Sequence, residues 1–269
     1  MLAIPLYDDN PRTRPPVATI ALISACVAVF LWQSGLSPRA ANNAALSLGM
    51  VPSVLFGEAS LPRQLEVVPA WMTLFTSMFL HGGWLHLGGN MLYLWIFGKG
   101  VESALGLPRY VALYLICGAI AALTQAIVNP ASEVPMIGAS GAIAGVLGAY
   151  LILHPRSNVV VFIWIIIIVR LITVPAVILL GLWFLLQLVS AASASPGEPG
   201  VAFYAHVGGF IAGMALVLLL RQRHVQVFQP PRSWSFQVAH PRDARERFGR
   251  GSVPDTGRRR SGSWRDPWN

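Results

Sequence analysis

Four polar side chains lie within otherwise apolar stretches of the chain, and their types suggest chemistry: Ser140, His206, His86 and Asn90. A charge at the centre of a membrane-spanning helix costs about 2.5 to 3.5 kcal/mol on insertion scales, so polar groups in such segments indicate a functional site. A serine hydroxyl becomes a nucleophile when an adjacent histidine takes its proton. Neutral donors on His86 and Asn90 can stabilise a developing oxyanion. Together these residue types predict nucleophilic attack on a carbonyl group.

Small residues surround the serine and follow the histidine. Ser140 lies in the sequence GASG, and glycines continue after it at Gly145 and Gly148. His206 has Gly209 and Gly213 three and seven residues later, on one helical face. Because small side chains let helix backbones approach closely, we expect the two helices to cross tightly and bring the imidazole within hydrogen-bonding reach of the hydroxyl. His86 and Asn90, four residues apart, share a face in the same way.

Each of these features also has a purely structural explanation. A serine in a membrane helix commonly bonds the carbonyl one turn earlier, and stripes of small residues are common packing devices. A histidine and an asparagine one turn apart can simply join two helices, and membrane histidines can line a proton path. These explanations do not account for a nucleophile, a base and two donors at one depth, so catalysis is favoured. No Asp or Glu lies in the outer half of a predicted span, which predicts a Ser–His dyad oriented by helix packing.

The composition excludes an ordinary soluble protein, because 55% of the 269 residues are hydrophobic and only 11% are charged. Of the net charge of +8, the last 49 residues supply +7: residues 221–269 hold eleven arginines and four acidic side chains. The chain thus reads as a membrane-embedded body with a basic tail that we expect to be disordered, and no nucleic-acid partner is expected. The cysteines Cys26 and Cys117 lie in apolar segments and indicate no disulfide.

A bilayer core takes roughly 20 apolar residues in a helix, and six segments of the chain fit this length. They predict an all-α membrane protein and run from Val17 to about Leu36, about Trp84 to Val101, Tyr110 to Val128, about Pro135 to Leu153, Ile172 to Ala192 and Val201 to Leu220. The apolar stretch Val159–Val169 is too short to span alone. We expect it to be an interfacial or re-entrant segment that leads into the fifth helix.

Basic residues in the short loops predict the orientation. Six of them flank one side and two the other: Arg12, Arg14, Lys99, Arg109, Arg156 and Arg170 against Arg39 and Arg63. Both termini are therefore expected in the cytoplasm, with residues 1–16 as a cytoplasmic segment. The first loop, about Ser37 to Gly83, is then outside and partly in the outer leaflet. The four candidate residues all fall in the outer half of the membrane.

Three motifs on three predicted helices carry a family resemblance. They are HGGWLHLGGNMLYLWIFG (His81 to Gly98, followed by Val101 and Glu102), GASGAIAG (Gly138 to Gly145) and AHVGGFIAG (Ala205 to Gly213). In this order, over about residues 5–220, the chain closely resembles the rhomboid intramembrane serine proteases. The resemblance implies a six-helix bundle over residues 17–220 with Ser140 as nucleophile and His206 as general base. It further implies an oxyanion hole of His86, Asn90 and the Ser140 backbone N–H, supported by His81, Gly138, Gly141, Glu102, Gly209 and Gly213.

The chain departs from some relatives at two places. Ala144 stands where an aromatic ring stacks on the catalytic histidine in some members, and the Trp-Arg pair of the first loop is absent, although Trp71 is present. Neither departure removes a catalytic group. Pro175 and Gly181 make the fifth predicted helix a candidate for a lateral gate.

The predicted function is cleavage of transmembrane protein substrates near the outer leaflet of the cell membrane. The expected partners are these substrates and membrane lipid, with no cofactor and no metal; the sequence predicts no oligomeric state. Two alternatives stay open. One is a catalytically silent membrane protein that binds helices, and the other is a small-solute channel that uses His86 and His206 as a proton path.

Overall fold

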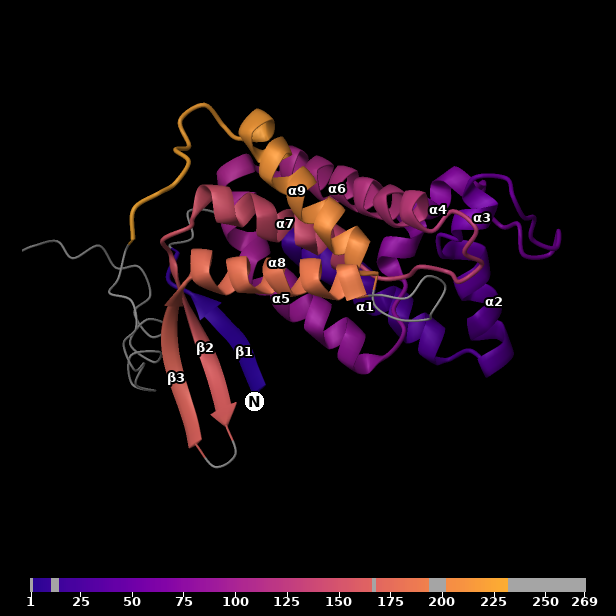
Figure 1. Ribbon diagram of the computed structural model, residues 1–269, viewed down its shortest axis with the longest axis horizontal. Helices are drawn as coiled ribbons and strands as arrows, with labels where there is room; N and C mark the ends of the chain where they lie inside the picture. Colours follow the sequence, from indigo (N-terminus) through magenta and orange to yellow (C-terminus); the bar gives the residue numbers. More distant parts are fainter. Residues whose placement is uncertain (1, 11–14, 166–167, 194–201, 232–269) are drawn as a thin grey trace, which may run out of the picture.

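The computed structural model describes residues 2–10, 15–165, 168–193 and 202–231, and helices dominate it (Figure 1). Six of the described helices have 14 residues or more: α1 (Val17–Ser34), α5 (Trp84–Leu105), α6 (Leu107–Val128), α7 (Ser140–Leu153), α8 (Ala176–Ser193) and α9 (Phe203–Leu220). Each of them occupies most of one predicted span. The boundaries differ most at α7, which begins at Ser140 rather than near Pro135, because residues 135–139 form a non-helical approach to the helix.

Helix α7 is the centre of the bundle. Every residue from Gly141 to Tyr150 is buried, with neighbours on α5, α6, α8 and α9. The tight crossing of α7 and α9 that the glycines predict is present: a Cβ added at Gly213 would collide with the backbone of Gly145, and one at Gly148 with the carbonyl of Phe210. At these positions the absence of a side chain brings one helix backbone directly against the other.

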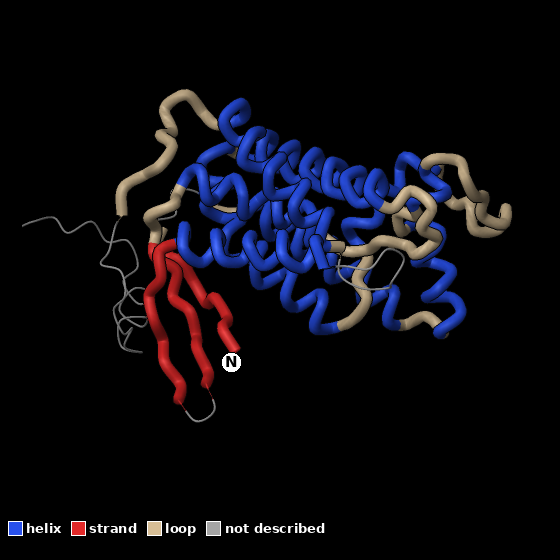
Figure 2. Tube along the Cα trace, in the orientation of Figure 1, coloured by secondary structure: helices blue, strands red, loops and turns tan. Residues whose placement is uncertain are grey.

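The expectation of an all-α fold is wrong, because the described residues include a three-stranded antiparallel sheet. It consists of β1 (Leu2–Asp8), β2 (Asn158–Ile165) and β3 (Ile168–Pro175) in the order β1-β2-β3. The segment expected as an interfacial or re-entrant stretch, Val159–Val169, instead contributes to β2 and β3. Figure 2 shows the sheet in red at one end of the helical body. The fifth helix consequently begins at Ala176 rather than Ile172.

Side-chain shape explains this difference. The segment is rich in valine and isoleucine, whose branched Cβ atoms favour strands over helices. Residue pairs such as Val159 with Val174 and Val161 with Ile172 lie opposite each other. Because β2 also pairs with β1, its backbone polar groups are satisfied on both sides, whereas β3 is an edge strand that pairs only with β2. An apolar run of this length has the hydropathy of a membrane segment whether it becomes a strand or a helix.

Two aspartates at the end of the amino-terminal strand join it to helix α7 and to strand β2. The Tyr150 hydroxyl on α7 donates to Asp8 Oδ2 at 2.7 Å, and the Asn158 N–H donates to Asp9 Oδ1 at 2.9 Å. Burial raises the pKa of the Asp8 carboxyl, against the opposing effect of the Tyr150 hydrogen bond. The amino terminus thus belongs structurally to the same end of the molecule as the β2–β3 hairpin.

The first loop folds into short elements at the opposite end from the sheet (Figure 1). They are α2 (Pro38–Leu48), α3 (Pro52–Leu55), a 3-10 turn at Ala70–Met72, α4 (Thr73–Thr76) and a second 3-10 turn at Ser77–Phe79. A β-bridge between Met50 and Met136 joins this loop to the segment that leads into α7. The loop therefore packs beside the entrance to the central helix.

Glu102, near the end of α5, holds the beginning of α1. Its carboxylate accepts the backbone N–H groups of Ala18 and Thr19, both at 2.8 Å, and the Thr19 hydroxyl at 2.7 Å. The first N–H groups of a helix lack intrahelical acceptors and carry partial positive charge, so a buried carboxylate satisfies both needs. Glu102 therefore has a structural role: it holds the beginning of α1 against the end of α5.

By length and apolar composition, four of the described helices could cross a membrane: α1, α6, α8 and α9. Helix α7 is a shorter apolar helix, and α5 has 22 residues that include several polar ones. After α9 the chain packs back on the body, where the Phe228 and Gln229 N–H groups donate to the Ile152 and Leu153 carbonyls. The rest of the tail that we expect to be disordered, residues 232–269, lies outside the described residues.

Candidate active site

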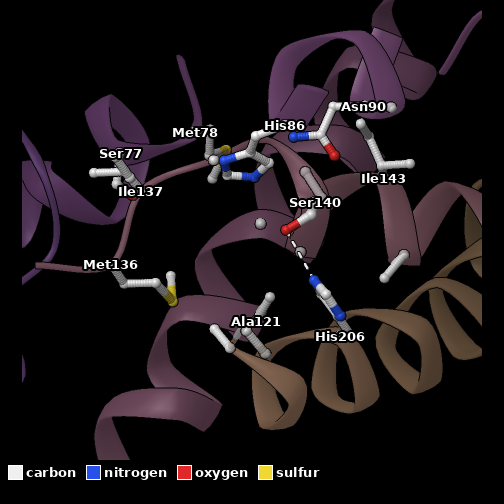
Figure 3. Close-up of a pocket in the computed structure, with 18 of the residues that line it drawn as sticks. Ser77, Met78, His86, Asn90, Ala121, Met136, Ile137, Ser140, Ile143 and His206 are labelled. Atoms are coloured by element: carbon white, nitrogen blue, oxygen red, sulfur yellow. Dashed lines mark hydrogen bonds between the residues drawn. The ribbon is translucent and has the colours of Figure 1, made fainter. Parts of the chain in front are cut away.

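Ser140 and His206 meet where α7 and α9 cross. Ser140 is the first residue of α7, and His206 lies in the first turn of α9. The serine Oγ and the histidine Nε2 are 2.8 Å apart and form a hydrogen bond (Figure 3). His206 is 7% exposed. A Cβ on Gly209 would strike the Gly141 carbonyl, so the glycines beside the two residues set this short separation.

The other ring nitrogen of His206 faces a residue that the sequence analysis missed. Nδ1 lies 2.7 Å from the side-chain oxygen Oε1 of Gln187 on α8. The signal was available, because Gln187 is the only polar residue between Ala176 and Val189. An amide oxygen accepts a hydrogen bond from an imidazole N–H as a carboxylate does, so the absence of acidic residues does not exclude a partner for His206.

Aromatic support for the imidazole also comes from α8. The Trp183 ring lies 5.9 Å from the His206 ring, centroid to centroid, with 36° between the planes. Ala144, where some relatives carry an aromatic residue, is fully buried in α7. In this chain α8 therefore supplies both the ring and the polar group next to His206.

His86 and Asn90 face the same cavity from α5, above Ser140 in Figure 3. The Gly82 N–H donates to Nδ1 of His86 at 3.3 Å. A neutral imidazole that accepts at one nitrogen carries its proton on the other, so Nε2–H is left as a donor. Asn90 is 9% exposed, and its Nδ2 has no hydrogen-bond partner among the described residues. Two donors are thus available at the cavity wall.

Gly138 explains how His86 fits beside the serine. Its φ of 126° lies in the region that favours glycine, and an added Cβ would lie 2.8 Å from both Cε1 and Nε2 of His86. The Gly138 N–H donates to the Ser77 carbonyl at 2.9 Å, which fixes the turn that leads into α7. A side chain at this position would therefore displace the histidine.

The cavity has a volume of about 680 Å³ and is walled by α5, α6, α7, α8 and the beginning of α9. Most of its lining is apolar and includes Met78, Met136 and Trp183. The polar side chains of Ser140, His206, His86 and Asn90 converge on it, a pattern typical of a binding or catalytic site. The described residues contain no group of three His, Cys, Asp or Glu side chains placed to hold a metal ion.

Of the residues predicted to support the site, some lie at the cavity and others lie away from it. His81 adjoins the site: its ring lies 5.2 Å from the His86 ring, and Nδ1 is 3.2 Å from the Phe79 carbonyl oxygen. Burial, aided by the nearby His86, lowers the pKa of His81 to about 4. Gly138 and Gly141 line the cavity, and Gly209 packs beside it. Gly213 lies one turn further along α9 and packs against the Gly145 backbone, whereas Glu102, near the far end of α5, hydrogen-bonds the start of α1.

Comparisons with known proteins show which family the chain resembles. The family description "Rhomboid domain" matches residues 69–223, which is more than half of the chain. Rhomboid protein 1, mitochondrial, of Saccharomyces cerevisiae is 31% identical over 158 residues, covering 57% of this chain and 41% of that protein. RHOMBOID-like protein 5 of Arabidopsis thaliana is 35% identical over 172 residues, covering 60% and 48%. Rhomboid protease GluP of Bacillus subtilis is 41% identical over 100 residues, covering 36% and 18%.

The chain belongs to the rhomboid family of membrane-embedded proteins, and the predicted resemblance is confirmed. Relatives that are named as proteases support intramembrane proteolysis at the level of the family. The aligned region spans less than half the length of each of the three relatives. The activity of this particular chain therefore rests on its own residues.

Proposed function

We propose that the protein is an intramembrane serine protease in which Ser140 is the nucleophile and His206 the general base. The hydrogen bond of 2.8 Å between Oγ and Nε2 at the wall of a cavity carries this proposal. It supplies the geometry of an activated nucleophile, with the base held within reach of the proton it must take.

The reaction proceeds in two stages. Ser140 Oγ attacks a peptide carbonyl carbon while His206 Nε2 takes the hydroxyl proton, which gives a tetrahedral intermediate and an imidazolium. The imidazolium passes this proton to the leaving amine, the C–N bond breaks and an acyl-enzyme forms. Water then attacks the ester carbonyl, again with His206 as base, and releases the carboxylate product and free Ser140.

The oxyanion is stabilised by three neutral donors. Nε2–H of His86 and Nδ2 of Asn90 line the cavity on the side of Ser140, and the Ser140 backbone N–H begins α7, where helix N–H groups lack intrahelical acceptors. A buried amide donor with no protein partner is costly in the resting enzyme. In the transition state Asn90 gains an acceptor, and this differential interaction accelerates the reaction.

The depth of the site follows from helix length. The 14 residues of α7 extend about 21 Å, whereas the hydrocarbon core is about 30 Å thick. If α7 ends near the inner surface, Ser140 lies below the outer surface, within reach of a substrate's outer-leaflet segment. We assign the sheet, the amino terminus and the basic tail to the cytoplasm and the first loop to the outside, with six crossings of the cell membrane.

The substrate class is a transmembrane segment that unwinds locally. A stable helix keeps its carbonyls in hydrogen bonds, so the cleaved segment must contain small or helix-weakening residues. The mostly apolar cavity can receive such a segment, and the polar side chains at its wall select the exposed carbonyl.

The decisive experiment reconstitutes the purified protein in liposomes with a transmembrane reporter. Ser140→Ala and His206→Ala are expected to abolish cleavage. Matched controls are Ser34→Ala, whose hydroxyl only bonds the Leu31 carbonyl of its own helix, and His224→Ala, an exposed histidine after α9. Both controls are expected to cleave at the wild-type rate.

The other outcomes separate the alternatives. Cleavage that survives both active-site substitutions would overturn the dyad. Reporter binding without cleavage by the wild type would indicate a silent helix-binding protein. A proton flux that His206→Ala abolishes, again without cleavage, would indicate a channel.

A further inference from the structure

We propose that Gln187 of α8 is a positioning residue that holds His206 in the tautomer needed to activate Ser140. The inference rests on the proposed protease function and adds to it a third, uncharged member supplied by a different helix. The hydrogen bonds of 2.7 Å and 2.8 Å at the two ring nitrogens place His206 between Gln187 and Ser140.

The reasoning begins with the two ends of the imidazole. A neutral ring carries one proton, so one nitrogen donates and the other accepts. The Ser140 hydroxyl can do either, and by itself it leaves the tautomer open. Oε1 of Gln187 can only accept, so Nδ1 must donate to it. Nε2 then presents its lone pair to the serine, which is the form required of a general base.

The position of Gln187 argues against an incidental contact. The fourteen residues Ala176–Val189 are apolar apart from this amide. Several side chains in this segment, among them Leu185 and Leu186, are exposed on the outside of the bundle. A polar side chain in such a helix is retained where it finds a partner inside the protein. His206 is the partner that the structure gives it.

An amide differs from the carboxylate of a Ser-His-Asp triad in its charge. Of the described residues that line the cavity with His206, the titratable ones are His86 and Tyr93, and none is acidic. Helix α8 carries no titratable group. The other helices packed on α9, α6 and α7, have titratable side chains that do not line the cavity: Arg109, Tyr110, Tyr114 and Cys117 on α6 and Tyr150 on α7. Gln187 therefore orients the imidazole without the added stabilisation of the imidazolium that a carboxylate gives.

Two substitutions separate orientation from charge. Gln187→Leu keeps much of the volume and removes the acceptor, and we expect kcat to fall about tenfold or more with KM little changed. Gln187→Glu keeps the acceptor and adds a negative charge, which favours protonated His206. The Glu variant should retain activity at high pH, and the acid limb of its kcat/KM profile should move to higher pH by about one unit or more. Leu186→Ala, at an exposed site on the same helix, is the control and should match the wild type in both respects.

A spectroscopic measurement tests the tautomer directly. In protein labelled with 15N at histidine, His206 of the wild type should have a protonated Nδ1 and an unprotonated Nε2 at high pH. Gln187→Leu should give a mixture of the two tautomers.

The proposal is overturned if folded Gln187→Leu keeps the wild-type kcat, pH profile and tautomer. It is also overturned if Gln187→Glu is as inactive at high pH as Gln187→Leu, since the oxygen would then not be the group that matters. Either result leaves the Ser140→Ala and His206→Ala test intact, so failure of this inference differs from failure of the protease assignment.

Discussion

The contact between α7 and α9 sets the dyad distance, and Gly213→Ala tests how strongly it does so. A Cβ at residue 213 would lie 2.5 Å from the carbonyl carbon and 2.7 Å from the Cα of Gly145. Non-bonded carbon atoms rest about 3.5 to 4.0 Å apart, so α9 must retreat by about 1 Å at this point. The contacting atoms are backbone on the α7 side, and no side-chain rotation relieves the collision.

The expected magnitude follows from this displacement. If most of it reaches His206, the distance of 2.8 Å between Nε2 and Oγ becomes about 3.8 Å, which is beyond hydrogen-bonding range. A misplacement of about 1 Å can lower a rate on the order of a hundredfold. Overpacking also destabilises a core by about 1 to 3 kcal/mol, partly offset by the gain of about 1 kcal/mol in helix propensity from Gly to Ala.

The assay measures kcat for reporter cleavage together with the midpoint of thermal unfolding. Gly181→Ala is the matched control, because a Cβ at that helical glycine meets nothing within 4 Å. We expect the control to keep its activity and to be neutral or slightly more stable. Wild-type kcat in a folded Gly213→Ala variant would refute the argument that this contact positions the dyad.

Three further predictions concern neighbouring residues. Asn90→Ala should lower kcat about a hundredfold or more with little loss of stability, because Nδ2 has no described partner at rest; an unchanged kcat would exclude it from the oxyanion hole. Glu102→Ala should lower the free energy of unfolding by roughly 3 kcal/mol, since three donors at the start of α1 lose their acceptor. Chemical denaturation in detergent measures this free energy, and an unchanged value would show that the contact contributes nothing to stability. Because the pKa of His81 falls from 6.5 to about 4 on folding, the unfolded chain takes up a proton in this interval that the folded protein does not. The stability that His81 contributes above about pH 6.5 should be lost as the pH falls to about 4. The free energy of unfolding of His81→Leu should therefore change less steeply with pH in this interval than that of the wild type, and equal slopes for the two proteins would contradict the prediction.

The residues that the structure brings together at the cavity could be predicted because polar groups in apolar spans are rare. Ser140, His206, His86 and Asn90 stood out by type alone, and the glycine spacing after His206 predicted the tight helix crossing. These signals are local, since each depends on a few residues within one helix. The helix that carries each residue was predictable for the same reason.

The rest depends on contacts between distant segments. Val159–Val169 was assigned by hydropathy, which does not distinguish a strand from a membrane segment, and its partner in β1 lies about 150 residues earlier. The valine and isoleucine side chains of this segment, which favour strands, were the signal that indicated a strand. Gln187 and Trp183 depend on the packing of α8 beside His206, and the sequence does not specify which face of α8 meets α9.

Covalent labelling tests the central claim most directly. A fluorophosphonate should attach to the wild-type protein, with mass spectrometry locating the adduct on Ser140, and His206→Ala should label far more slowly because its serine is not activated. Adduct on another residue, or equal labelling of the wild type and His206→Ala, would contradict the assignment of Ser140 and His206 as a catalytic pair.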